Sequence, residues 1–205
     1  LNSLMIAFLT TVCCLLISIL GSYAMTRLKY PGRRFFKTSI IFSYLIPTAV
    51  LFVPMYVFVS KLGFYDNKWA LLIIYPTTVV PYCCYMLMSY FKAIPYALEE
   101  AALIDGCTRM KSLRYIITPI ALPGIAVVAT FAFTMSWNEY LYAMIMTTSP
   151  AQQTAVVAIS SFKYADSAIW GRIMAASVLT SLPVTIIYIV AQAQLISGKS
   201  DGSVK

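Results

Sequence analysis

The side chains best suited to chemistry in this sequence stand close together between Pro95 and Pro119. Three of the seven acidic residues of the chain, Glu99, Glu100 and Asp105, lie in this segment. The sequence contains no histidine, so the commonest general base and metal ligand is missing. Without a nucleophile or base beside them, these carboxylates indicate ion pairing with another surface rather than catalysis.

Local signals predict that this segment is a helix, a tight corner and a second helix. Pro95 suits a first helical position because its φ is already fixed near the helical value. Gly106 can take the left-handed conformation that ends a helix. Thr108 can cap a following helix that runs through Arg114. We therefore expect a rigid bent element.

The first of these helices is predicted to have two unlike faces. Glu99 and Glu100 fall on one face, and Ala101 and Ala102 fall on the other, where small side chains would let another surface approach closely. The alternative is an amphipathic helix lying on the membrane surface. In that position the carboxylates, with Asp105, would face an anionic leaflet.

A second group of candidate residues is Trp137, Asn138, Glu139 and Tyr140. A carboxylate facing lipid costs several kcal/mol, so Glu139 is expected to face the interior of a helix bundle or an aqueous path. Aromatic rings beside polar groups suit the apolar faces and hydroxyls of a sugar. Alternatively, Trp137 and Tyr140 belong to an interfacial aromatic belt, with Glu139 at the outer headgroup level.

The composition around these groups is that of an integral membrane protein. Hydrophobic residues make up 60% of the 205 positions and charged residues 11%, whereas soluble proteins carry about 25% charged residues. Apolar runs of about 20 residues are long enough to cross a bilayer. Prolines within them are interpreted as kinks. The predicted spans are about 4–26, 38–60, 69–91, 115–138 and 173–198, with an extramembrane loop around 147–172.

The basic residues are distributed unevenly between the two sides that five spans define. One side receives 11 of the 15 lysines and arginines. The positive-inside rule places that side, with the Pro95–Pro119 segment and the C-terminus, in the cytoplasm. Because the positive charges cluster at the ends of spans, the net charge of +8 does not indicate nucleic-acid binding.

No cofactor or metal site is predicted. The five cysteines form two adjacent pairs plus Cys107, and neighbours on one helix point to different faces, which suits neither a metal nor a disulfide. The run GKS at 198–200 lacks the glycine of a phosphate-binding loop, since Ala193 occupies that position. Any ATP must therefore be bound by another chain.

The segment EEAALIDG, followed by nine residues and IITP, resembles the cytoplasmic signature of permeases of ATP-binding-cassette importers, which reads Glu-Ala-Ala, three residues, Gly, nine residues, Ile-x-Leu-Pro. Thr118 departs from it, standing where leucine is usual, and Cys107 stands where alanine is common. The matching positions are Glu100, Ala101, Ala102, Gly106, Ile116 and Pro119. GSYAMTRLKYPGRR, IPTAVLFVPMY, SWNEYLYA and MAASVLTSLPV look like the carbohydrate-importer branch, in particular its maltose-transporter-like second permease family.

The resemblance implies an all-α integral membrane protein with the transmembrane domain of a type I ABC importer. Such subunits usually have six spans, so the first is expected to be missing from these five. The bent element would be a cytoplasmic coupling helix that docks on an ATPase, with Glu100 pairing with its basic groups. The implied coupling residues are Glu99, Glu100, Ala101, Ala102, Asp105 and Gly106.

The resemblance also implies partners and a location. They are a second permease subunit, two cytoplasmic ATPase subunits that bind ATP and Mg²⁺, an extracytoplasmic solute-binding protein and the lipid of a prokaryotic cytoplasmic membrane. The expected function is that of a non-catalytic subunit of an importer for di- or oligosaccharides. The alternatives are a permease for a polyol or a glycerol-phosphate-like solute, or an ATP-independent secondary transporter, which would need internal repeats or intramembrane charge pairs.

Overall fold

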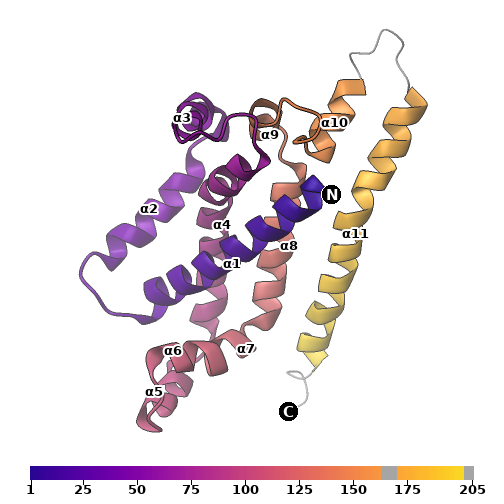
Figure 1. The fold of residues 1–205 in the computed structure, drawn as a ribbon. Helices are drawn as coiled ribbons and strands as arrows, with labels where there is room; N and C mark the ends of the chain where they lie inside the picture. Colours follow the sequence, from indigo (N-terminus) through magenta and orange to yellow (C-terminus); the bar gives the residue numbers. More distant parts are fainter. Residues whose placement is uncertain (163–169, 201–205) are drawn as a thin grey trace.

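A computed structural model describes residues 1–162 and 170–200 of the protein, and these residues form helices and connecting loops without any strand (Figure 1). The helices α5 and α6 lie at one end of the bundle, and α3, α9 and α10 lie at the other. The elements are α1 (Asn2–Arg27), α2 (Arg33–Leu45), α3 (Thr48–Lys61), η1 (Lys68–Ala70), α4 (Leu71–Ala93), α5 (Tyr96–Ile104), α6 (Arg109–Ser112), η2 (Leu113–Ile117), α7 (Thr118–Ile120), α8 (Leu122–Asn138), α9 (Leu141–Met146), α10 (Ala155–Ser161) and α11 (Trp170–Ser200).

Three helical stretches in the described part of the chain are long and apolar enough to cross a membrane, namely α1, η1 with α4, and α11. Two further apolar stretches are bent, by 99° between α2 and α3 and by 82° before α8. Counting each bent pair as one span gives five. The chain is therefore a multi-pass membrane protein. The C-terminus and Lys163, which entered the charge count, lie outside the described residues, as does part of the loop predicted around 147–172.

The prolines act differently from the uniform kinks that the sequence predicted. Ile46, which precedes Pro47, is extended, with φ −72° and ψ 121°, and α2 ends there. A residue before proline is driven toward this conformation by the proline ring. By contrast, α3 continues through Pro54 and α4 continues through Pro76 and Pro81. The span predicted over 38–60 is thus two helices meeting at a sharp corner.

The predicted span 115–138 also begins later than expected. The segment from α6 through the π-helical η2 to α7 runs at a steep angle to α8, which starts at Leu122 with Pro123 in its first turn. The 17 residues of α8 rise about 25 Å. Glu139 follows α8 directly and so lies about 25 Å from its start, a length close to the hydrocarbon thickness of about 30 Å.

Close packing of α1, α4 and α8 forms the centre of the bundle. Cys14, Cys83 and Ala132 lie in one buried cluster, and the Ser22 hydroxyl donates to the carbonyl of Cys84 at 3.0 Å. Small residues at such positions let membrane helices approach closely. The three helices therefore connect the two ends of the molecule as one packed unit.

At the end opposite α5, polar contacts hold the loop after α9. The Asn2 amide donates to the carbonyls of Ala151 and Gln153 at 2.8 and 3.1 Å. Asp66 accepts hydrogen bonds from the hydroxyl and the backbone N–H of Ser149. These bonds lower the pKa of the Asp66 carboxyl, so the contact is favoured while this group is ionised and weakens as the pH falls through its lowered pKa.

The close contact between α4 and α8 at Gly124 leads to a prediction about stability. A Cβ atom added to Gly124 on α8 would lie 2.4 Å from Cγ of Tyr90 on α4, so the Tyr90 ring or one of the two helices must shift. We expect Gly124→Ala to lower the free energy of unfolding by about 1–3 kcal/mol, measured as the fraction that stays folded after heating in detergent. Gly21→Ala is the control, because its Cβ would make an ordinary 3.5 Å contact with Cys84. Equal heat resistance of the two variants would contradict this packing.

Candidate functional site

The corner after α5 is a glycine-dependent helix stop, as the sequence predicted. Gly106 has φ 85°, the left-handed conformation. The N–H of Cys107 donates to the carbonyl of Ala102 at 2.9 Å and that of Gly106 to the carbonyl of Leu103 at 3.2 Å. This pair of bonds is the Schellman arrangement, which satisfies the last carbonyls of a helix. The chain thus turns sharply without leaving polar groups of the backbone unpaired.

The next helix begins with the predicted cap. The Thr108 side chain accepts a hydrogen bond from the N–H of Lys111 at 3.3 Å, at the start of α6. A threonine in this position satisfies one of the free donors of the first turn. The helix, corner and second helix are therefore confirmed as one bent element.

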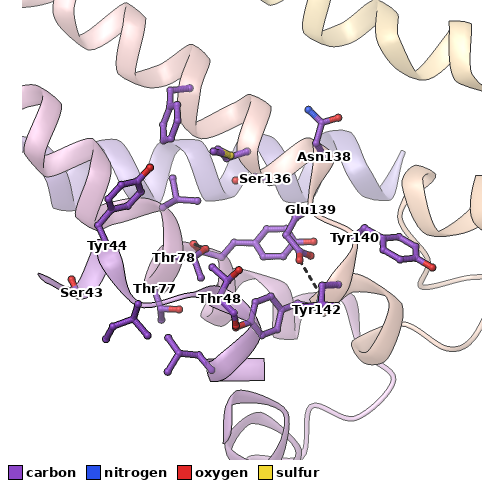
Figure 2. A pocket seen from close by; sticks show the side chains of 17 residues that line it. Ser43, Tyr44, Thr48, Thr77, Thr78, Ser136, Asn138, Glu139, Tyr140 and Tyr142 are labelled. Carbon is purple, nitrogen blue, oxygen red and sulfur yellow. Dashed lines mark hydrogen bonds between the residues drawn. The ribbon is translucent and has the colours of Figure 1, made fainter. Parts of the chain in front are cut away.

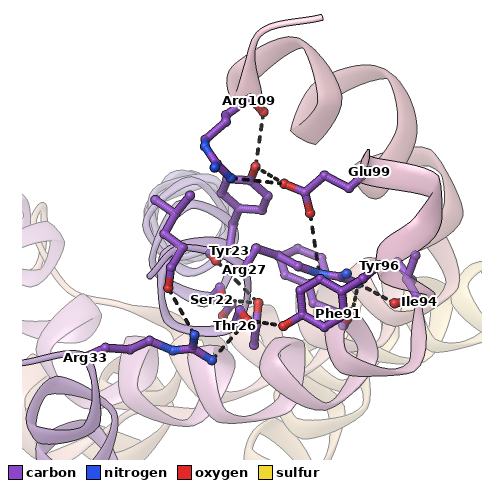
Figure 3. Close-up of polar contacts among 11 residues, drawn as sticks. Ser22, Tyr23, Thr26, Arg27, Arg33, Phe91, Ile94, Tyr96, Glu99 and Arg109 are labelled. Atoms are coloured by element: carbon purple, nitrogen blue, oxygen red, sulfur yellow. Dashed lines mark hydrogen bonds and ion pairs between the residues drawn. The ribbon is translucent and has the colours of Figure 1, made fainter. Parts of the chain in front are cut away.

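The adjacent glutamates of α5 face in different directions, which corrects the expectation that they share a face. Glu99 is only 4% exposed, whereas Glu100 is exposed. Tyr23 donates to Oε1 of Glu99 at 2.5 Å, and Nη1 of Arg109 lies 3.9 Å from the same oxygen. The Nε atom of Arg27 lies 3.8 Å from Oε2 (Figure 3). Glu99 is thus paired within its own chain.

Arg27 joins the ends of three helices. Its guanidinium is buried and donates to the carbonyls of Phe91 and Ile94 at the end of α4. It also lies 4.2 Å from the centre of the Tyr96 ring on α5, at a distance favourable for a cation–π contact. The Tyr96 hydroxyl in turn donates to the carbonyl of Thr26 at 2.6 Å. We call Tyr23, Arg27, Tyr96, Glu99 and Arg109 the inner clasp.

The remaining coupling candidates are divided between the two sides of α5. Ala102 is buried, three residues after Glu99 and on the same side. Glu100, Ala101, Asp105 and Gly106 are exposed. The exposed side also carries Leu98 and Ile104, which is 86% exposed. The surface that α5 presents outward is therefore apolar, with one carboxylate from Glu100 and another from Asp105.

Sequence reasoning missed the inner clasp. Arg27 entered only as one of many basic residues at the end of a span, and Tyr23 was not singled out. Their partner Glu99 is far away in the sequence, so no local periodicity relates them. The only available signal was an arginine placed directly at the end of an otherwise uncharged span. An arginine in that position can be exposed to water or can pair with a buried acid, so this signal does not identify Glu99.

A pocket of about 470 Å³ lies near the opposite end, between the α2–α3 corner, α4 and the junction of α8 with α9 (Figure 2). Three of the four residues proposed for a substrate path, Asn138, Glu139 and Tyr140, line it. The lining residues that bear hydroxyl groups are Ser43, Tyr44, Thr48, Tyr75, Thr77, Thr78, Ser136, Tyr140 and Tyr142.

Trp137 is placed elsewhere. Its indole Nε1–H donates to the carbonyl of Thr180 on α11 at 3.0 Å, and its ring stacks on Phe133 with centroids 5.5 Å apart. A buried indole usually finds such a partner. Trp137 therefore packs α8 against α11 instead of lining the pocket with its three neighbours.

Glu139 has a structural function at the wall of the pocket. Its two carboxylate oxygens accept from the backbone N–H groups of Tyr142 at 3.0 Å and Ala143 at 3.1 Å. These groups belong to the first turn of α9, where unpaired donors favour an anion. The carboxylate thus orients α9 while lying beside the pocket.

The inner clasp generates a prediction. Glu99→Ala leaves the positive charge of Arg27 buried without a counter-ion, and breaking a buried pair in this way costs about 3–5 kcal/mol. We expect lower heat resistance in detergent and faster proteolysis within 95–108. The control is Arg114→Gln, which removes an exposed charge nearby. If Glu99→Ala behaved like this control, the pairing would not hold α5 in place.

Comparison with known proteins supports a family assignment. Residues 15–199 match the family described as "Binding-protein-dependent transport system inner membrane component". The chain is 37% identical to the inner membrane ABC transporter permease protein YcjP of Escherichia coli, over 100% of this chain and 73% of that protein. It is 34% identical to the trehalose/maltose transport system permease protein MalG of Thermococcus litoralis, over 100% of this chain and 74% of that protein.

A solved structure has the same fold. It is the crystal structure of a bacterial ABC transporter involved in the import of the acidic polysaccharide alginate, with TM-score 0.81 and 23% identity, over 94% of this chain and 72% of that chain. The match to this importer chain agrees with the multi-pass helical bundle described above. Because the family match covers most of the sequence and the two relatives align over all of it, the chain belongs to the family of inner membrane components of binding-protein-dependent transport systems.

Proposed function

We propose that this chain is a permease subunit of an ATP-driven saccharide importer, in which it forms half of the translocation path beside a second permease subunit. The observation that carries the proposal is the exposed helix and glycine corner of α5–α6, tied to α1 and α4 by the inner clasp. The trehalose/maltose relative supports a saccharide as the cargo.

In this function α5 is the coupling helix. Its outward surface has small and apolar side chains at Ala101, Leu98 and Ile104, which suit a cleft on a protein partner, and Glu100 offers a charge for a basic group there. ATP can drive transport only if it binds the two conformations of the complex with different affinity. A displacement of α5 reaches the spans because the clasp attaches α5 to the ends of α1 and α4.

The other subunits supply what this chain is not expected to contain. Two cytoplasmic ATPase subunits bind ATP and Mg²⁺, and this chain contributes no catalytic group. An extracytoplasmic solute-binding protein delivers cargo at the opposite end, where α9, α10 and the loop between them lie. The orientation follows from the positive-inside rule, with α5 and the C-terminus in the cytoplasm of a prokaryotic cell.

The substrate path includes the pocket lined by Asn138, Glu139 and Tyr140. Because Glu139 lines this pocket, we favour a wall of an aqueous path over the outer headgroup level for its position. Trp137 supports this wall from behind through its contact with α11. A polyol is the second candidate cargo, because the hydroxyl groups that line the pocket would hydrogen-bond it equally well.

The corner gives the main test of coupling. Gly106→Val forces a β-branched residue into a left-handed conformation, so we expect solute uptake to fall at least about tenfold while the amount of protein in the membrane is unchanged. Gly63→Val is the matched control. Gly63 also has positive φ and open surroundings, but it lies just after α3, at the end of the bundle opposite α5. Normal uptake by Gly106→Val, measured with radiolabelled saccharide, would refute the coupling role.

Glu100 gives a separate test of assembly. Glu100→Lys reverses the exposed charge without touching the inner clasp, so we expect less ATPase subunit to co-purify at low salt, where charge interactions are least screened. Glu100→Gln should have a smaller effect, because it removes the attraction without adding repulsion. Full recovery of the ATPase with the lysine variant would mean that Glu100 does not face it.

A further inference from the structure

We propose that the pocket beside Glu139 binds a hydroxyl-rich part of the cargo and disfavours saccharides that carry an acid group there. The inference rests on the proposed function, and it narrows the substrate class from saccharides in general to those without an acid group at this position. It follows from the hydrogen bonds that the polar groups of the pocket wall already donate to the backbone, and from the charge in the wall.

Four hydroxyl groups in the wall have already donated their hydrogen to the backbone. The side chains of Ser43, Thr77, Thr78 and Ser136 each bond a carbonyl oxygen three or four residues earlier on the same helix, at 2.6–2.9 Å. A carbonyl can only accept, so the direction of these bonds is certain. Each hydroxyl oxygen therefore offers the pocket lone pairs and no proton.

Two further lining groups follow the same pattern. One N–H of the Asn138 amide donates to the carbonyl of Thr134 at 3.0 Å, which leaves its second N–H available, and the Tyr142 hydroxyl donates to the carbonyl of Thr48 at 3.1 Å. The wall is thus rich in acceptors. Among the described residues, the hydroxyls of Tyr44, Thr48 and Tyr140 make no such bond and can still donate to a ligand, whereas the Tyr75 hydroxyl is buried beyond the reach of one.

The charge in the pocket also disfavours an acidic ligand. Among the lining residues Glu139 is the only charged one, and neither lysine nor arginine is present. Proteins bind carboxylate or sulfonate groups with arginine, lysine or free backbone N–H groups. The nearby N–H groups of Tyr142 and Ala143 already bind Glu139. An anionic ligand would therefore meet the negative charge of Glu139 with no lysine or arginine in the wall to offset it.

The size and the aromatic lining fit a sugar unit. A volume of about 470 Å³ lies within the range of small-molecule sites, roughly 300–1,000 Å³. Tyr44, Phe131 and Tyr140 supply aromatic surface for the apolar faces of sugar rings. A saccharide without an acid group brings many hydroxyl donors to these acceptors and no negative charge near Glu139.

The test compares three matched probes on the complete complex of both permeases and the ATPase in lipid nanodiscs. The probes are radiolabelled trehalose, trehalose with one hydroxymethyl group oxidised to a carboxylate, and trehalose with one hydroxyl replaced by an amine. We expect trehalose to bind at least about tenfold more tightly than the carboxylate. The amine should bind at least as tightly as trehalose, because the acceptors and the Glu139 carboxylate favour a cationic donor. Equal or tighter binding of the acid than of trehalose, or no binding of any probe, would overturn the inference.

Variants link the preference to this pocket. Thr78→Val replaces an acceptor by a methyl group of similar size and should weaken trehalose binding about threefold to tenfold. Glu139→Gln should narrow the gap between trehalose and the carboxylate by at least threefold. Thr130→Val is the control, because Thr130 makes the same type of bond on α8 but does not line this pocket. Unchanged preferences in the first two variants would place selection elsewhere.

A separate measurement of uptake tests the proposed function independently of the selectivity of the pocket. If the complex takes up any saccharide in an ATP-dependent manner when its binding protein is present, the proposed function stands, whatever the three probes show. If trehalose binds in the pocket and yet no ATP-dependent uptake of any saccharide occurs, the proposed function fails while the chemistry of the pocket stands.

Discussion

The buried ion pair between Arg27 and Glu99 is the interaction on which the end of the bundle that carries α5 depends. Removing two charges from water is costly, and the cost is offset only when the remaining polar atoms of both groups find partners. Here the partners are two carbonyls at the end of α4, the Tyr23 hydroxyl and the face of the Tyr96 ring, while Nη1 of Arg27 makes no hydrogen bond within the described residues. Because α5 cannot move away without separating these charges, it is bound to follow the ends of the spans.

The opposite end of the bundle is organised by a carboxylate that binds backbone donors. Glu139 orients α9 through the first free N–H groups of that helix, and its charge also lies at the wall of the pocket. Between the two ends, α1, α4 and α8 pack closely through small residues such as Gly124. One packed unit therefore connects the exposed surface of α5 to the pocket, and the proposed coupling between these two ends requires such a connection.

Sequence reasoning was accurate wherever the information was local. The glycine corner at 106, the cap at Thr108 and the apolar character of the spans all depend on residues within a few positions of one another. It was less accurate for proline. Pro47 follows the end of one helix, while Pro54 lies inside another. Proline prevents one hydrogen bond in either setting, and neighbouring helices decide whether the chain turns or continues.

By itself, the sequence determined that the chain is an all-helical membrane protein with a polar bent element between spans, since composition and periodicity depend only on neighbours along the chain. Only the tertiary structure decided that Glu99 turns inward while Glu100 remains outside, and that Trp137 faces α11 while Glu139 faces the pocket. Adjacent residues on a helix differ by about 100° in direction. Which of them is buried depends on partners from distant segments, and these partners are brought together only by folding.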